Sequence, residues 1–130
     1  MGFIGSTYST SRGVFDLRGV SAGDAAEMEA RVNAVLVGDS SPNLLIEAVL
    51  TGVGEGPRWM AMLAFAKDLG QPRVTARAVA ATGGTAAEAH SKLLERIAAT
   101  PFVDDVLKVE IAGGGNGLSF MALAIVDLAV

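Results

Sequence analysis

The spacing of apolar residues predicts two amphipathic helices. Apolar residues recur every three or four positions after Asp24 and again after Thr85, as they do along one side of an α-helix. Both stretches open with a capping box, in which a Glu three residues after the cap can return a hydrogen bond to the start of the helix. The two stripes are Ala25, Met28, Val32, Leu36 and Ala86, Ala89, Leu93, Ile97. We expect each helix to run for about fourteen residues.

Alternation of apolar and polar residues predicts a β-hairpin after each helix. Residues 44–51 and 106–112 alternate in the same phase, with three apolar side chains of each expected on one face. The three are Ile46, Ala48, Leu50 in the first segment and Leu107, Val109, Ile111 in the second. The return strands at 58–67 and 119–128 are apolar almost throughout, and this is typical of strands covered on both faces. Residues 14–18 and 74–80 are predicted to be edge strands.

An internal repeat relates these segments. When the sequence is shifted by 61 positions, residues 12–69 align with 73–130 without a gap, and ten of the 58 aligned pairs are identical. The matches gather at the helix starts and in two glycine-rich turns, Gly52–Gly56 and Gly113–Gly117. Since such residues mark the ends of structural elements, their placement favours a repeated unit.

These patterns predict one α+β domain over residues 1–130, built from a duplicated β-α-β-β unit. We expect a mainly antiparallel sheet with two helices packed on one face. Residues 1–11 are expected to form an N-terminal arm, residues 12–69 the first half and residues 73–130 the second. The face without helices is expected to meet another subunit or to curl into a barrel.

Composition narrows the classes of function. Of the 130 residues, 51% are hydrophobic and none is Cys, which excludes disulfides and cysteine nucleophiles. The net charge of −4 and the lack of a basic stretch disfavour nucleic-acid binding. We expect no membrane span, no cofactor and no metal site. A cytoplasmic or virion-borne protein is expected, and the Ala- and Gly-rich, Lys-poor composition is typical of bacteria.

Two groups of polar residues are candidate reactive sites. The loop Thr82, Gly83, Gly84, Thr85 precedes a helix N-terminus, where free N–H groups favour an anion, and Arg73 could assist it. His90, the sole histidine, is a weak candidate for a catalytic base. Capping alone also explains the loop, and a helix histidine without a catalytic role explains His90. The glycines of the two turns are expected because glycine readily adopts the positive φ angles that tight turns require.

Excess apolar surface favours self-association over catalysis. The residues expected at an interface between copies are Trp59, Met60, Met62, Phe120, Met121 and Leu123. The leading hypothesis is a non-enzymatic structural or assembly protein that forms a closed homo-oligomer. A second hypothesis is a lyase, isomerase or hydrolase with an anion-binding site between subunits. A third is a module that binds an apolar ligand in a pocket of Met28, Met60, Met62 and Phe65.

Overall fold

The computed structural model describes residues 3–11, 13–38, 44–67, 75–115 and 117–129. Their elements are β1 (Phe3–Thr10), β2 (Gly13–Ala22), α1 (Ala25–Gly38), β3 (Leu44–Gly52), β4 (Trp59–Lys67), β5 (Ala76–Gly83), α2 (Ala86–Ala99), β6 (Val103–Gly113) and β7 (Phe120–Leu128). Within these residues the α+β class, the two helices of 14 residues and the antiparallel strands are confirmed.

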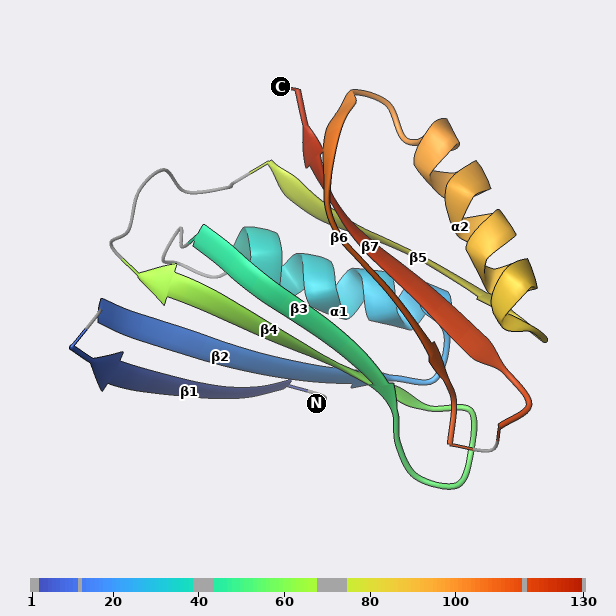
Figure 1. The fold of residues 1–130 in the computed structure, drawn as a ribbon, viewed down its shortest axis with the longest axis horizontal. Helices are drawn as coiled ribbons and strands as arrows, with labels where there is room; N and C mark the ends of the chain where they lie inside the picture. The colour runs from blue at the N-terminus through green and yellow to red at the C-terminus, as the bar shows by residue number, and fades with distance from the viewer. Residues whose placement is uncertain (1–2, 12, 39–43, 68–74, 116, 130) are drawn as a thin grey trace.

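The strands form two sheets, although one sheet was expected. Sheet A has the order β1-β2-β4-β3 and sheet B the order β5-β7-β6 (Figure 1). The helix α1 contacts β2 and β5, whereas α2 packs on the strands of sheet B alone. Alternate residues of β5 lie in the two different cores, so α1 and α2 cover opposite faces of sheet B. The prediction that both helices share one face is therefore wrong. The apolar strands β5 and β7 are covered by α2 on one face and by α1 and the strands of sheet A on the other.

The N-terminal arm is a strand. Residues 3–10 form β1, which pairs antiparallel with β2 from Phe3 opposite Val20 to Thr10 opposite Gly13. The segment is rich in β-branched and aromatic residues, which favour strands. The pairing places β2 inside the sheet, so β2 is not the edge strand that its mixed polarity predicts, while β5 is at the edge of sheet B.

Strand pairing follows the same register in the two parts of the chain. In sheet A, Trp59 lies opposite Ala22 on one side and Gly52 on the other. In sheet B, Phe120 lies opposite Gly83 and Gly113, which are 61 positions later in each case. We call residues 13–67 the first half and residues 76–128 the second half.

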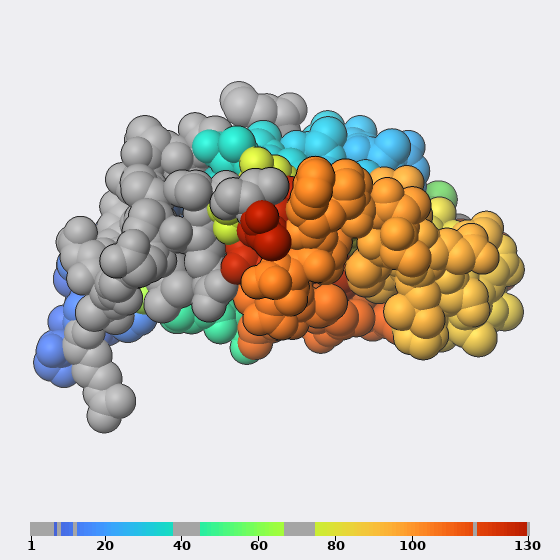
Figure 2. Space-filling view, turned by 90° about the horizontal axis from the view of Figure 1, so that it is seen from above, coloured from blue at the N-terminus to red at the C-terminus, as the bar shows by residue number. Residues whose placement is uncertain are grey.

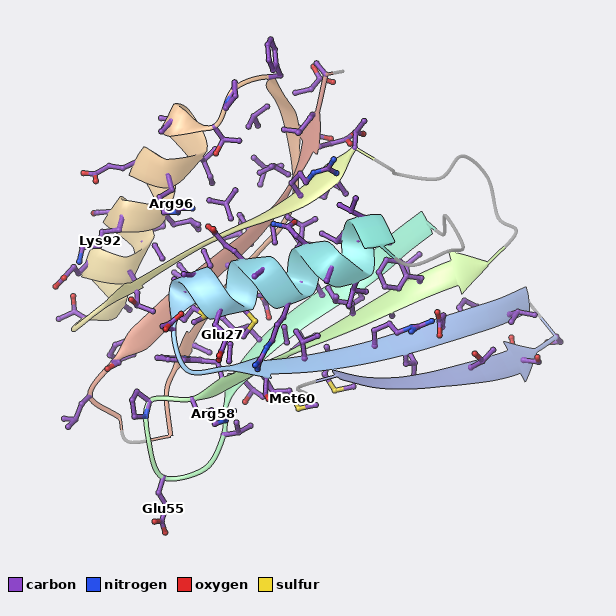
Figure 3. The ribbon with its side chains drawn as sticks, turned by 180° about the vertical axis from the view of Figure 1, so that it is seen from behind. Glu27, Glu55, Arg58, Met60, Lys92 and Arg96 are labelled. Carbon is purple, nitrogen blue, oxygen red and sulfur yellow. The ribbon has the colours of Figure 1, made fainter. Side chains whose placement is uncertain are left out.

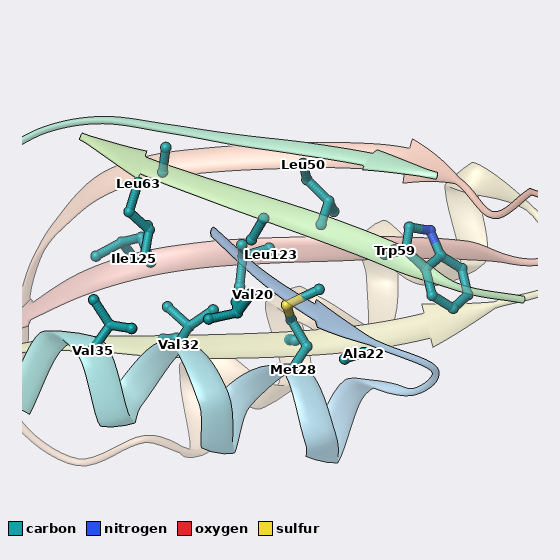
Figure 4. Packing of buried hydrophobic residues seen from close by; sticks show 14 of the residues in the cluster. Val20, Ala22, Met28, Val32, Val35, Leu50, Trp59, Leu63, Leu123 and Ile125 are labelled. Carbon is teal, nitrogen blue, oxygen red and sulfur yellow. The ribbon is translucent and has the colours of Figure 1, made fainter. Parts of the chain in front are cut away.

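A central core joins the two halves (Figure 4). One face of β4 and the helix α1 pack against one face of β5 and β7, with Leu63 and Ile125 among the fully buried side chains. A smaller outer core lies between α2 and the other face of β5 and β7, and includes Leu93 and Val126. All of residues 121–126 are buried. The chain itself therefore covers both faces of β7, and no partner is needed there.

A bulge in each hairpin alters the predicted faces. The register shifts between Leu45 and Glu47 in β3 and between Val106 and Lys108 in β6. A bulge adds one residue to one strand, and this changes the phase of the alternation. Ile46 is consequently 41% exposed although Ala48 and Leu50 are buried, so the predicted shared face of the three is wrong.

The glycine-rich turns pack against each other, which local turn geometry does not explain. A Cβ placed on Gly52 would be 2.0 Å from the carbonyl oxygen of Gly113, and one on Gly115 would be 2.0 Å from that of Gly54. Turn geometry accounts for Gly54 and Gly117, whose φ angles are 72° and 70°. Glycine thus allows two backbones to touch as well as to turn.

Both helix starts are capped, and in each the Glu returns its bond to the glycine before the cap residue. Asp24 Oδ1 accepts from the N–H of Glu27 at 2.7 Å, and Glu27 Oε1 accepts from the N–H of Gly23 at 2.8 Å. Thr85 Oγ1 accepts from the N–H of Glu88 at 3.0 Å. In the view from above, the residues of α1 (cyan to blue) and of α2 (yellow to orange) occupy separate areas of the surface (Figure 2). In the described part of the chain, neither is long and apolar enough to cross a membrane.

Candidate interaction surface

The outer face of sheet A is mainly apolar, and no helix or strand of the described residues covers it. Since side chains alternate along a strand, the buried face of β4 leaves Met60, Met62 and Ala64 on the other face. Their neighbours in register are Gly19 and Val49 beside Met62, and Leu17 and Glu47 beside Ala64. We call the set Phe15, Leu17, Val49, Met60, Met62 and Ala64 the back face.

Exposure on the back face is unusual for its residue types. Met62 is 44% exposed and Val49 is 46% exposed, in the middle of adjacent strands. Met60 (labelled in Figure 3) is half-buried. Among the polar residues on this face are Ser21 and Thr51, which pair with Met60 at one end, and Glu47, which pairs with Ala64. A sheet face in water normally carries polar residues, so this face has the character of an interaction surface.

A second exposed apolar strip lies on β6. Val106, Val109 and Ile111 pair with Val126, Ala124 and Ala122, three residues of the outer core. They therefore lie on the face of sheet B that carries α2, but they are 44%, 47% and 41% exposed. Leu94, on α2, is 54% exposed. We call Val106, Val109 and Ile111 the β6 strip.

An ion pair connects the hairpins of the two halves. Lys108 Nζ lies 3.0 Å from Glu47 Oε1 where β3 and β6 come together. The hydrogen bond from Lys108, then the one from the Ala48 N–H, and the charge of Lys108 together lower the pKa of Glu47. Both side chains are partly exposed, and pairs of this kind contribute little to stability.

The six residues predicted at an interface do not share a surface. Trp59, Met121 and Leu123 are 1%, 0% and 2% exposed and belong to the central core. Phe120 is half-buried beside the outer core. Met60 and Met62 lie on the back face. An interface between copies stays a prediction, and of the six residues only Met60 and Met62 lie on the back face where it is expected.

A carboxylate from the first turn of α2 already bonds to the loop before this helix. Gly84 and Thr85 are exposed, and Thr82 and Gly83 are half-buried. Hydrogen bonding and charge from Lys92 lower the pKa of Glu88, and a hydrogen bond from the Gly84 N–H acts in the same direction. The ionised Glu88 thus takes up the positive end of the helix, which argues against an added anion. Arg73 lies outside the described residues.

The remaining candidate sites lack convergent groups. His90 is exposed on α2, and no group of three His, Cys, Asp or Glu side chains in the described residues could hold a metal ion. The apolar pocket is not formed as predicted. Met28 and Phe65 are in the central core, whereas Met60 and Met62 lie on the opposite face of β4, an odd number of residues from Phe65.

Two helix side chains close the edge of sheet B. Asn33 Oδ1 accepts from the Ala78 N–H at 2.7 Å and Asn33 Nδ2 donates to the Ala78 carbonyl at 3.3 Å. Glu29 Oε1 accepts from the Ala80 N–H at 2.7 Å and pairs with Arg96. The sequence places both residues off the apolar stripe of α1, where a solvent-facing position is the natural prediction. For Asn33 the signal is a polar residue that flanks the helix stripe in the first half and is replaced by Leu94 in the second half.

A buried ion pair was also not foreseen. Asp16 is 2% exposed and accepts from Arg18 Nε at 2.9 Å and from Arg18 Nη2 at 2.7 Å. The two residues are separated by one position on β2, so they project from the same side of the strand. Because its partner is adjacent on the same strand, we assign this pair a structural role.

No protein-family model matches the chain, and no curated protein sequence matches it.

Proposed function

We propose that this chain is a non-enzymatic assembly protein that associates with copies of itself through the back face. The observation that carries the proposal is the exposure of Met62 and Val49, which lie side by side in the middle of a mainly apolar sheet face. Burial of apolar area is the main driving force of association, and a methionine adapts its shape to a partner surface. A second copy is the natural partner, because most soluble oligomers consist of identical chains.

The internal repeat supports this function. We infer that the two halves are a duplicated β-α-β-β unit, because the strand registers recur 61 positions apart and the bulge at Ile46 recurs at Leu107. A unit that packs against its own copy within one chain already has the surface needed to pack against a copy in another chain. Self-association is therefore an extension of the packing that stabilises the monomer.

The test is the mass of the protein in solution at micromolar concentration, measured by light scattering and by sedimentation equilibrium. We expect the unaltered chain to exceed the monomer mass. Met62→Lys places a charge in the centre of the back face and should lower the average mass towards that of the monomer. Val37→Lys is the matched control, since Val37 is 52% exposed near the end of α1, away from this face.

A monomeric mass for the unaltered chain would overturn the proposal. The same would follow if Met62→Lys retained the mass of the unaltered chain while circular dichroism showed it to be folded. An effect of Val37→Lys equal to that of Met62→Lys would show that added charge alone changes association, and would also count against the back face.

A further inference from the structure

The two halves pack on each other through unlike faces. In each half, the helix lies on one side of the three strands, and we call this the helix side. The helix side of the first half, with Ala48, Leu50 and Leu63, contributes one wall of the central core (Figure 4). The other wall is the side of the second half without a helix, with Met121 and Leu123. The intramolecular contact is thus head to tail.

This arrangement leaves one face of each kind open. The first half has an open back face, and its Met60 and Met62 are 61 positions before Met121 and Leu123. The second half has an open part of its helix side, the β6 strip, and its Val109 and Ile111 are 61 positions after Ala48 and Leu50. The two open faces therefore correspond to the two faces that are already in contact within the chain.

We propose that the β6 strip of one copy packs on the back face of the next copy, so that chains associate head to tail. The proposal rests on the self-association proposed above and specifies its geometry. It continues the packing of the first half on the second half into a neighbouring molecule. Such contacts join unlike surfaces, and they give a ring where the rotation closes and a filament where it does not.

Charge complementarity supports this orientation. Within the chain, Glu47 of the first half pairs with Lys108 of the second half, 61 positions later. The same correspondence places Lys108 of one copy beside Glu47 of the next copy. Two acidic or two basic residues at these positions would repel one another, whereas the residues present attract. The assembly would then carry a row of alternating Glu47 and Lys108 side chains.

The edge strands support it as well. In the first half, Asn33 bonds to the open edge of β5, and the residue 61 positions later is Leu94. In the proposed contact, Leu94 meets the region of β2 in the next copy, where the edge of β2 is already paired with β1. An amide would have no backbone groups to bind there, and an apolar side chain fits. Leu94 is 54% exposed in the single chain.

The experiment is a complementation of two charged variants. Met62→Lys keeps the β6 strip and loses the back face, whereas Val109→Lys keeps the back face and loses the β6 strip. We expect each variant alone to associate at least about tenfold more weakly than the unaltered chain. Mixed in equal amounts and labelled with different fluorophores, the two should form a one-to-one heterodimer, because the mixture contains one intact surface of each kind.

The outcomes separate this geometry from the proposed function. If the unaltered chain associates and Val109→Lys associates equally well, the copies meet back face to back face, and the head-to-tail proposal is wrong although self-association stands. A mixture that stays monomeric overturns it likewise. A monomeric unaltered chain overturns both. Should either variant fail to fold by circular dichroism, Val49→Lys and Ile111→Lys, which are also exposed, replace them with the same expected results.

Discussion

The two halves of the molecule share their strand pairing but differ in what covers it. In the second half, α2 packs on its own sheet, and the other side of that sheet meets the first half. In the first half, α1 is shared between β2 and β5, and none of the described elements covers the far side of the sheet. Leu123 is accordingly 2% exposed, while Met62 at the matching position is 44% exposed. Equivalent strands thus acquire different environments from their neighbours rather than from their own sequence.

The largest expected effect distinguishes the two aromatic residues that begin the return strands. Trp59 is 1% exposed and its Nε1 donates to the carbonyl of Ala112 at 2.9 Å, whereas Phe120 is half-buried. Trp59→Ala should lower the free energy of unfolding by about 3–5 kcal/mol, because it removes a large core side chain and a bond between halves. Urea titration should show a smaller loss for Phe120→Ala. Equal losses would contradict the asymmetry of the two cores.

The next effect concerns the contact between the turns. In Gly52→Ala the new methyl group would meet the carbonyl of Gly113, so we expect a loss of about 3 kcal/mol, as for severe overpacking. Gly56→Ala is the control, since nothing lies within 4 Å of its Cβ position. Thermal unfolding would measure both. If the two variants had the same midpoint, the turns would not be in contact in solution.

A moderate effect is expected where α1 and α2 differ at matching positions. Asn33→Leu gives α1 the residue that α2 has in Leu94, and it leaves the N–H and carbonyl of Ala78 without their side-chain partner. The loss should be about 1–2 kcal/mol by chemical denaturation. Ala34→Leu adds the same side chain at an exposed neighbouring position and should change stability little. Equal stability of the two variants would show that the edge bonds are dispensable.

The smallest effect lies at the ion pair between the hairpins. The folded pKa of Glu47 is lowered from its ordinary value of 4.5, so its stabilisation is complete above that pH and is lost as the pH falls through the folded pKa. Lys108→Met removes the main cause of the lowered pKa of Glu47. The stability difference between the unaltered chain and this variant should therefore be small and constant near neutral pH and should shrink in acid. A difference that grows in acid would contradict the pairing.

Local features of this fold were predictable from the sequence. Both helices, their capping boxes and the four hairpin strands follow from residue spacing, because backbone hydrogen bonding and side-chain period are local properties. The strand β1 was missed because its polar residues resemble a loop, although Ile4, Tyr8 and the threonines favour a strand. The bulges at Ile46 and Leu107 carry no local signal, since one added residue preserves the composition of a strand.

The packing of the halves was not predictable in the same way. Trp59 and Met62 are both large and apolar on one strand, and their sequence does not tell which face meets the second sheet. The surface prediction therefore combined residues of opposite faces. Asn33 and Glu29 were missed because their partners are backbone groups of β5, and no sequence pattern in α1 encodes a distant edge.

One side-chain amide has a consequence for the fate of the protein at high concentration. Asn33 occupies both the donor and the acceptor of Ala78, the main-chain groups that an incoming strand would need for cross-β stacking. Together with the bond from the Ala80 N–H to Glu29, these bonds remove backbone groups of the alanine-rich strand β5 from pairing with another strand. Another strand therefore cannot pair with β5 at Ala78, and copies of the chain have to associate through the faces of their sheets instead of through this edge.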